Sequence, residues 1–496
     1  MSLRYKGGII SSVAPTTSGT PYTGAAPGIW SKDDQMQAKA AGLWPKGVGV
    51  PDAPTSIVAT AGTTQASVTF TAPADNGGSA ITEYTATSSP GGISASGASS
   101  PITVTGLTDG TQYTFTVVAT NDRGNSAPSA VSNAVTPANT EFKLFTWGSN
   151  IVGSGGLGNN TKYSSPKQVG SLTTWVTTSG MRTQGGGVDS AGRLWMWGQN
   201  FYGSLGLGNQ TYYSSPKQVG ALTNWASVNG AGSIVAIKTN GTIWGWGQNN
   251  HGQLGIGNTT NYSSPKQIGA LTDWLSIRMT GNYHCTLAIR GVGTSGALWS
   301  WGSNFGGSCG LGNTTKYSSP KQVGALTNWE KLQTGSWNGS ASAIKTDGTL
   351  WAWGYGTNGN LGLGNTTNYS SPKQVGLLTT WTHVSKSANA TTAVADGKLY
   401  MWGGTNTFGQ LGQGNLNQYS SPKQVGSLTT WLSGAADYNT AAIKTDGTLW
   451  TWGKNNNGQL GLGNTTYYSS PKQVGSLTKW NKVDLLLDGC IAQQSI

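Results

Sequence analysis

A tyrosine and a lysine recur at a spacing of four residues, within the string Tyr-Ser-Ser-Pro-Lys-Gln, which occurs seven times. A tyrosine ring can stack on a sugar face, and a lysine ammonium can pair with an acidic group. Segments rich in Asn and Thr flank each string and can hydrogen-bond hydroxyls. We therefore predict a ring of seven weak ligand sites that act together through avidity. The candidate residues are Tyr163, Lys167, Tyr213, Lys217, Tyr262, Lys266, Tyr317, Lys321, Tyr369, Lys373, Tyr419, Lys423, Tyr468 and Lys472.

The same residues have a structural interpretation, which stays open at this stage. The tyrosines can pack between neighbouring repeats, and the lysine stems can lie over them. Duplication also copies residues from repeat to repeat without selection for binding.

Histidines and cysteines, the usual ligands of transition metals, do not recur with the repeats. They occupy non-equivalent positions and show no metal-ligand spacing. Three cysteines are also too few for a disulfide framework. We therefore expect no metal site. The residues concerned are His251, His284, His383, Cys285, Cys309 and Cys490.

Acidic residues and glycine loops show no catalytic or cofactor pattern. Acids such as Asp347, Asp396 and Asp446 precede glycine in hairpin turns, so a glycosidase pair is not expected. The run 153–158 matches a dinucleotide fingerprint by letter, but it aligns with the glycine loops of later repeats and opens no helix. We predict a protein that is not an enzyme, with no catalytic residue and no cofactor.

The charge balance favours acidic partners. The chain carries 29 basic and 17 acidic residues, a net charge of +12. No window of about 18 residues is apolar enough to cross a bilayer, and the first ten residues hold no apolar run. We expect no membrane insertion and no secretory signal.

Short β-strands must position the repeated tyrosines and lysines. The Ser-Ser-Pro-Lys-Gln strings recur every 49 to 55 residues, and a Trp follows each. A Trp-Gly pair also recurs at an equivalent position in seven units, at Trp147, Trp197, Trp246, Trp301, Trp353, Trp402 and Trp452. Four strands in about 50 residues are the signature of a propeller blade. The second unit predicts strands over Lys217–Val219, Trp225–Val228, Ile234–Lys238 and Ile243–Trp246, with Asn240-Gly241 as the turn between the last two.

The number of units predicts a closed ring of seven blades over residues 141–496. The first unit begins at a fourth strand, Lys143–Trp147, and the last unit ends with Cys490–Ile496. We expect the seventh blade to combine three C-terminal strands with this N-terminal strand. Such closure removes the exposed sheet edges of an open array.

These units resemble the regulator of chromosome condensation repeat family. The resemblance rests on the Trp-Gly pair, on the Gly-x-Leu-Gly-x-Gly-Asn loop (Gly203–Asn209) and on the Asp-Gly-Thr-Leu-Trp hairpin (Asp446–Trp450). It implies a seven-bladed propeller. It does not carry over the founding member's exchange-factor role, because that protein's basic tail and catalytic residues have no match here. Prokaryotic and phage chains also carry this repeat.

Residues 51–137 predict a second domain, a β-sandwich. Runs of alternating polarity are separated by turn clusters over about 90 residues. The string 107–117 resembles the corner and following strand of a fibronectin type III domain, with Tyr113 as the corner tyrosine. Phe70 stands where that family usually has a core Trp.

Residues 1–50 are less regular. Ser31 can cap a short helix over Lys32–Ala41. The pattern Pro-Gly-x-Trp, short helix, Gly-x-Trp-Pro resembles an N-terminal segment of structural proteins of tailed phages. This resemblance implies a segment that docks on other virion proteins through Trp30 and Trp44. A disordered leader is the alternative.

These observations lead to two main hypotheses for an all-β protein. In the first, it is a tailed-phage virion component, a tail fibre or a head or tail appendage. It is then located on the virion, forms a homo-oligomer, and uses the propeller for host-surface glycans or virion contacts; nucleic acid is not an expected partner. The alternative is an intracellular regulatory propeller that binds chromatin or nucleic acid, which the net charge favours. A polysaccharide-degrading enzyme, the third hypothesis, lacks an acid–base pair.

Overall fold

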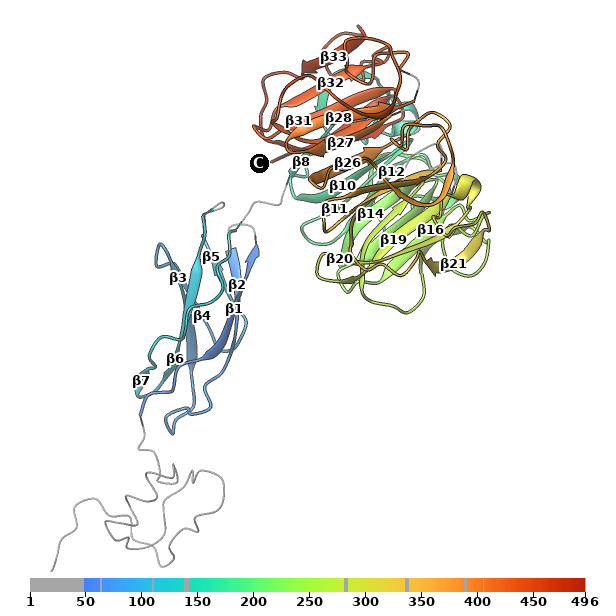
Figure 1. The fold of residues 1–496 in the computed structure, drawn as a ribbon. Helices are drawn as coiled ribbons and strands as arrows, with labels where there is room; N and C mark the ends of the chain where they lie inside the picture. The colour runs from blue at the N-terminus through green and yellow to red at the C-terminus, as the bar shows by residue number, and fades with distance from the viewer. Residues whose placement is uncertain are drawn as a thin grey trace, which may run out of the picture. The chain divides into compact units, whose positions relative to one another are not determined.

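The computed structural model describes two compact units, Met1–Thr140 and Glu141–Ile496. Both are built from β-strands, with three short 3-10 turns in the second (Figure 1). Trp30, Trp44 and the helix expected over Lys32–Ala41 lie outside the described residues. In the ranges described, no helix has the length and apolarity needed to cross a membrane. The structure describes residues 49–62, 65–108, 111–137, 142–280, 284–334, 339–387, 390–404 and 406–495.

The first unit is a sandwich of two antiparallel sheets, as predicted. Inward residues alternate with outward ones along its strands, so that Phe115, Val117 and Ala119 enter the core from one strand. One sheet has the order β1 (Thr55–Gly62), β2 (Gln65–Thr71), β5 (Ile102–Thr105), and the other β4 (Ser94–Gly97), β3 (Glu83–Ser89), β6 (Thr114–Asn121), β7 (Gly124–Asn125).

Tyr113 occupies the corner that the sequence predicts for it. Its hydroxyl accepts a hydrogen bond from the backbone N–H of Thr108 at 3.1 Å, and its ring is buried. Phe70 is buried in the core, with its ring centroid 4.8 Å from that of Tyr84. An aromatic core therefore forms without the usual Trp.

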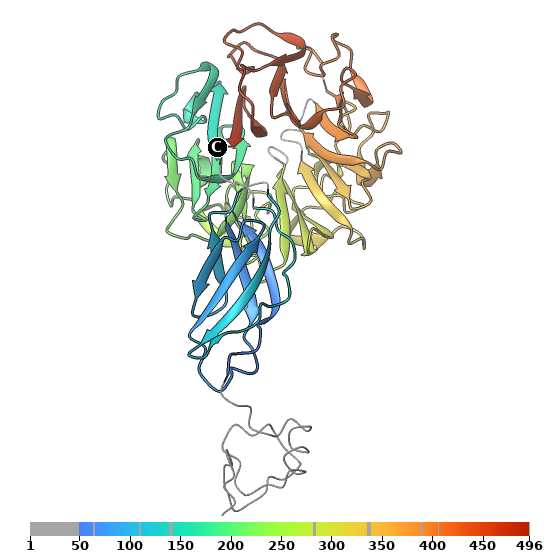
Figure 2. The same cartoon turned by 90° about the vertical axis from the view of Figure 1, so that its left-hand side faces the viewer.

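The second unit is a ring of seven four-stranded antiparallel blades. Some adjacent blades are linked by one β-bridge, as between Trp175 and Phe142. Figure 2 shows the blades following one another around a common centre. Listed from the innermost strand outwards, the blades are β10 (Trp175–Met181), β11 (Gln184–Asp189), β12 (Leu194–Gly198), β13 (Tyr213–Gln218); β14 (Trp225–Ala231), β15 (Ser233–Lys238), β16 (Ile243–Gly247), β17 (Tyr262–Gln267); β18 (Trp274–Met279), β19 (Cys285–Val292), β20 (Ser295–Gly302), β21 (Tyr317–Gln322); β22 (Trp329–Thr334), β23 (Ser340–Lys345), β24 (Leu350–Gly354), β25 (Tyr369–Gln374); β26 (Trp381–Lys386), β27 (Thr391–Ala395), β28 (Lys398–Gly403), β29 (Tyr419–Gln424); β30 (Trp431–Ala436), β31 (Asn439–Lys444), β32 (Leu449–Gly453), β33 (Tyr468–Gln473); and β34 (Trp480–Leu486), β35 (Gly489–Ser495), β8 (Phe142–Gly148), β9 (Tyr163–Gln168).

The blade that closes the ring combines two C-terminal strands with two N-terminal strands. The prediction of three C-terminal strands and one N-terminal strand is wrong. The C-terminal β35 pairs with β8 over seven residue pairs, as expected for the first strand of the propeller. However, each Tyr-Ser-Ser-Pro-Lys-Gln strand pairs with the Trp-Gly strand before it and is the outermost strand of that blade. The reason is that the glycine loop between them, such as Gly203–Asn209, turns the chain back antiparallel through left-handed residues.

The two repeated tryptophans of each blade form the core. They pack edge to face, with ring centroids 5.9 to 6.3 Å apart. The indole Nε1–H of every Trp-Gly tryptophan also donates to a carbonyl of the preceding blade, at 2.9 to 3.1 Å. The seven bonds join Trp147 to Gln459, Trp197 to Ser154, Trp246 to Ser204, Trp301 to Gln253, Trp353 to Ser308, Trp402 to Asn360 and Trp452 to Gln410.

A glycine two residues after each acceptor lets the two blades approach. Gly461 has φ +70°, and a Cβ there would lie 2.8 Å from Nε1 of Trp147. The six equivalent glycines would place a Cβ 2.5 to 2.8 Å from their tryptophans. Only glycine fits this contact.

We expect Gly461→Ala to lower the free energy of unfolding by about 2–5 kcal/mol, because it combines left-handed strain with a clash against Trp147. Gly475→Ala is the matched control, since Gly475 has φ +57° and open space where its Cβ would lie. This control should cost only about 1–2 kcal/mol. Chemical denaturation of both variants measures the difference, and equal losses would contradict the blade contact.

Candidate functional site

The fourteen predicted ligand residues, which we call the belt, lie on the seven outermost strands. Each tyrosine begins its strand and is half-buried, and each lysine is exposed. Every lysine Nζ lies 5.4 to 5.9 Å from the ring centroid of its own tyrosine, within cation–π range. The structure thus pairs aromatic and cation as the spacing suggested.

The belt tyrosines also have packing roles. Tyr213 and Tyr262 pack against a cluster that contains Trp225 and Trp246, and five tyrosine hydroxyls accept hydrogen bonds from asparagine amides, as Tyr262 does from Asn258 at 3.1 Å. These contacts support the packing interpretation for the rings. Ligand binding by the belt stays a prediction.

The excess positive charge of the chain belongs to the propeller. Residues 142–496 contain 23 of the 29 basic and nine of the 17 acidic residues, a net charge of +14. Among the described residues, no belt lysine has a carboxylate within ion-pair distance. The lysines are therefore available to an acidic partner.

A second set of lysines, which sequence reasoning missed, lies between tryptophans inside the blades. In Lys345 the Nζ lies 4.9 Å from the ring centroid of Trp329 and 3.8 Å from that of Trp351, with 6% of the residue exposed. Lys238 and Lys444 repeat this arrangement. Burial lowers the pKa of Lys238 and Lys345. The recurrent Lys-Thr-Asp/Asn-Gly string at the hairpin turn is the sequence pattern that could have identified these lysines.

We expect Lys345→Met to reduce the free energy of unfolding by about 1–2 kcal/mol, because the stem remains while the buried cation–π contact is lost. The control Lys321→Met removes an exposed belt cation and should change stability by less than about 0.5 kcal/mol. Urea denaturation provides the measurement. A loss at Lys321 as large as that at Lys345 would refute the structural role of the buried cation.

Two of the histidines and two of the cysteines come together in pairs that their sequence positions did not indicate. The rings of His251 and His284 stack with centroids 5.1 Å apart. Burial, aided by the charge of His251, lowers the pKa of His284 to about 4. Cys285 and Cys309 are buried with their Sγ atoms 3.0 Å apart. No group of three or more His, Cys, Asp or Glu that could hold a metal occurs in the described ranges.

The histidine pair predicts destabilisation by acid. Because its pKa is lowered, His284 favours folding while neutral, so its contribution is present above pH 6.5 and is lost as the pH falls toward 4. We expect the free energy of unfolding to fall by about 2 kcal/mol between pH 7 and pH 5 for this reason. Unfolding in urea at both pH values, for wild type and His284→Gln, tests it; an unchanged pH dependence in the variant would rule out this origin.

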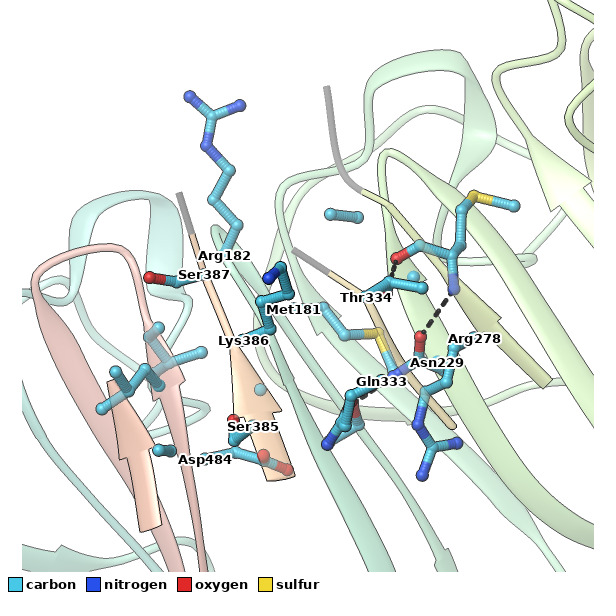
Figure 3. Close-up of a pocket in the computed structure, with 18 of the residues that line it drawn as sticks. Met181, Arg182, Asn229, Arg278, Gln333, Thr334, Ser385, Lys386, Ser387 and Asp484 are labelled. Atoms are coloured by element: carbon cyan, nitrogen blue, oxygen red, sulfur yellow. Dashed lines mark hydrogen bonds between the residues drawn. The ribbon is translucent and has the colours of Figure 1, made fainter. Parts of the chain in front are cut away.

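A central channel, also missed from the sequence, is lined by the innermost strands of all seven blades. It contains two cavities of about 170 and 410 Å³. The two cavities adjoin, because both are lined by Arg278, Gln333, Ser385, Lys482 and Asp484. Figure 3 shows polar side chains of several innermost strands around the first cavity, among them Asn229, Gln333 and Asp484.

Two family profiles match the chain, one for each unit. The Fibronectin type III domain matches residues 52–135. The Regulator of chromosome condensation (RCC1) repeat matches six segments that together span more than half of the chain. These segments are residues 191–237, 240–288, 295–338, 347–394, 396–436 and 446–484.

Sequence relatives share parts of the propeller. The Ultraviolet-B receptor UVR8 of Arabidopsis thaliana is 35% identical over 95 residues, which are 19% of this chain and 21% of UVR8. The E3 ubiquitin-protein ligase HERC2 of Homo sapiens is 31% identical over 120 residues, 23% of this chain and 2% of HERC2. The chain thus spans about a fifth or less of the length of these relatives.

Solved structures share the propeller fold. Prp20p from Saccharomyces cerevisiae, whose binding properties to Gsp1p and histones are described with its structure, has a TM-score of 0.61 at 17% identity, covering 71% of this chain and 91% of its own. Human WBSCR16 has a TM-score of 0.62 at 17% identity, covering 71% of this chain and 99% of its own. At this identity the likeness shows the fold.

Proposed function

Since the chain belongs to the regulator of chromosome condensation (RCC1) repeat family, we propose that it is a non-enzymatic recognition protein whose propeller binds an acidic macromolecule through the belt. One observation carries the proposal: seven exposed lysines, each held over a tyrosine ring and none paired with a carboxylate among the described residues. The propeller's net charge of +14 attracts such a partner from a distance.

The cation–π contacts prepare the lysines for binding. A lysine loses rotamer entropy when it is fixed by a partner, and the ring beneath it removes part of that loss in advance. Each site is weak, but a long polyanion can contact several lysines at once and gain avidity. A rigid duplex can touch only an arc of the ring, whereas a flexible acidic chain can follow its curvature.

The regulatory alternative from the sequence is the first candidate role. The comparisons favour it over the virion hypothesis, because they place RCC1-type proteins such as UVR8 and Prp20p beside this chain. The acidic partner is then nucleic acid or a nucleic-acid assembly, which the charge of the propeller favours. The activity of any relative is not carried over, because few residues are shared.

A virion fibre or appendage is the second candidate role. The fibronectin type III domain favours it, since this module commonly serves as a spacer or adhesion unit. The acidic partner in that case is a host-surface glycan, the virion contact lies in residues 1–50, and the protein is a homo-oligomer located on the particle.

We expect replacement of all seven belt lysines by glutamine to weaken polyanion binding at least tenfold. The control variant carries seven arginines, which keep the charge. Binding of the full chain to a fluorescent 20-bp DNA duplex and to heparin, measured from 50 to 300 mM salt, tests this. Affinity should fall with salt, with a steeper slope for the probe that contacts more lysines. Wild-type affinity in the glutamine variant would overturn the proposal.

The two candidate roles give different results. Retention of duplex at physiological salt supports the regulatory role. Preference for the acidic glycan, together with loss of attachment to virion proteins on deletion of residues 1–50, supports the virion role.

A further inference from the structure

The channel is a part of the propeller where the repeats differ. The Tyr-Ser-Ser-Pro-Lys-Gln string is identical in all seven blades, yet the residue four positions after each strand-opening tryptophan is of six different types. All seven of these residues line the channel. They are Ser179, Asn229, Arg278, Gln333, Ser385, Ala435 and Asp484. Copies that are identical in the outermost strand have diverged here, so a packing requirement common to all blades does not explain these residues.

A second ring of channel residues lies two positions after each tryptophan. It combines four hydroxyl groups with two lysines and a histidine, and all seven residues line one of the two cavities. They are Thr177, Ser227, Ser276, Lys331, His383, Ser433 and Lys482. The two rings therefore surround the channel with hydrogen-bonding groups in an asymmetric order.

Arg278 is a cation of the channel without a close carboxylate among the described residues. Its Nη1 donates to the carbonyl of Ile277 at 2.9 Å, and no ion pair to it lies within 4 Å in the described part of the chain. Desolvation lowers its pKa, and the charge of Asp484 acts in the opposite direction. A guanidinium has five N–H donors, so several remain for an anion.

The other channel cations already have partners. Lys482 lies 3.4 Å from Asp484 and donates to the carbonyl of Thr178. Lys331 lies 3.8 Å from Glu330 and donates to the carbonyl of Thr382 at 2.7 Å. Lys386 donates to the carbonyl of Asn360, and burial lowers its pKa to about 7. The four remaining cations, Arg182, Arg278, Lys331 and Lys482, face three carboxylates, Glu330, Asp437 and Asp484, so the lining has at least one positive charge in excess.

We propose that the central channel binds an acidic monosaccharide, with its anionic group on Arg278 and its hydroxyls on the Ser, Thr, Asn and Gln side chains of the two rings. The larger cavity, about 410 Å³, has the size of an ordinary ligand pocket. Carboxylates and phosphates both match the planar donors of a guanidinium. Figure 3 shows Asn229, Arg278, Gln333 and Ser385 among the residues that line the first cavity.

The test uses isothermal titration of the full chain with D-glucuronate, glucose 6-phosphate, glucose and inorganic phosphate. Either acidic sugar should bind, and the two distinguish a carboxylate from a phosphate source. Glucose and inorganic phosphate should each bind at least tenfold more weakly, because each lacks half of the recognised chemistry. No binding of either acidic sugar at millimolar concentration, or equal binding of glucose or phosphate, would overturn the proposal.

Variants place the site in the channel. Arg278→Met should weaken binding at least tenfold, and Arg123→Met, which changes an exposed arginine of the β-sandwich, should not. Gln333→Leu should cause a several-fold loss and covers the case in which Arg278→Met does not fold. Wild-type affinity in both channel variants would overturn the assignment. The seven-glutamine belt variant should bind the sugar normally, so this proposal can fail independently of the proposed function.

Discussion

The hydrogen bond from each Trp-Gly indole to a carbonyl of the preceding blade is the contact on which the propeller depends. This bond requires a glycine two residues after the acceptor residue, since a Cβ at that position would lie 2.5 to 2.8 Å from the indole nitrogen. Seven such bonds run around the ring, and the bond from Trp147 to Gln459 joins residues 312 positions apart. Closure thus uses the same contact as every other blade junction. Every blade therefore has a neighbouring blade on both sides, and the row of blades has no open end.

This constraint explains why so much of each repeat is invariant. The glycine loop of one blade also contacts the outermost strand of the next: a Cβ on Gly203 would lie 2.4 Å from Cα of Ser263, and Gly208 donates its N–H to the Ser263 carbonyl at 2.8 Å. The repeated serines are therefore part of the blade junction. The exposed belt lysines lie outside this junction, whereas channel residues such as Asn229 and His383 also hydrogen-bond neighbouring blades.

Positive charge is divided between two environments. Lysines such as Lys345 are buried between tryptophan rings and contribute to stability. The belt lysines lie over half-buried tyrosines but face solvent. Identical chemistry, a cation on an aromatic face, thus has a structural role inside the blade and provides an accessible charge at its outer edge, because only the outer position leaves the ammonium in water.

The sequence by itself determined the β-sandwich, the number of blades, the turns and the corner role of Tyr113, because these follow from local patterns and from a repeat period. The pairing of tyrosine with lysine was also predictable, since both lie in one strand. Tertiary structure alone decided which sheet receives each outermost strand, the stacking of His251 on His284, the contact of Cys285 with Cys309 and the composition of the channel. Spacing along the chain does not specify these features: loops of similar length can return to either neighbouring strand, and a channel appears only when seven separate strands meet around one axis.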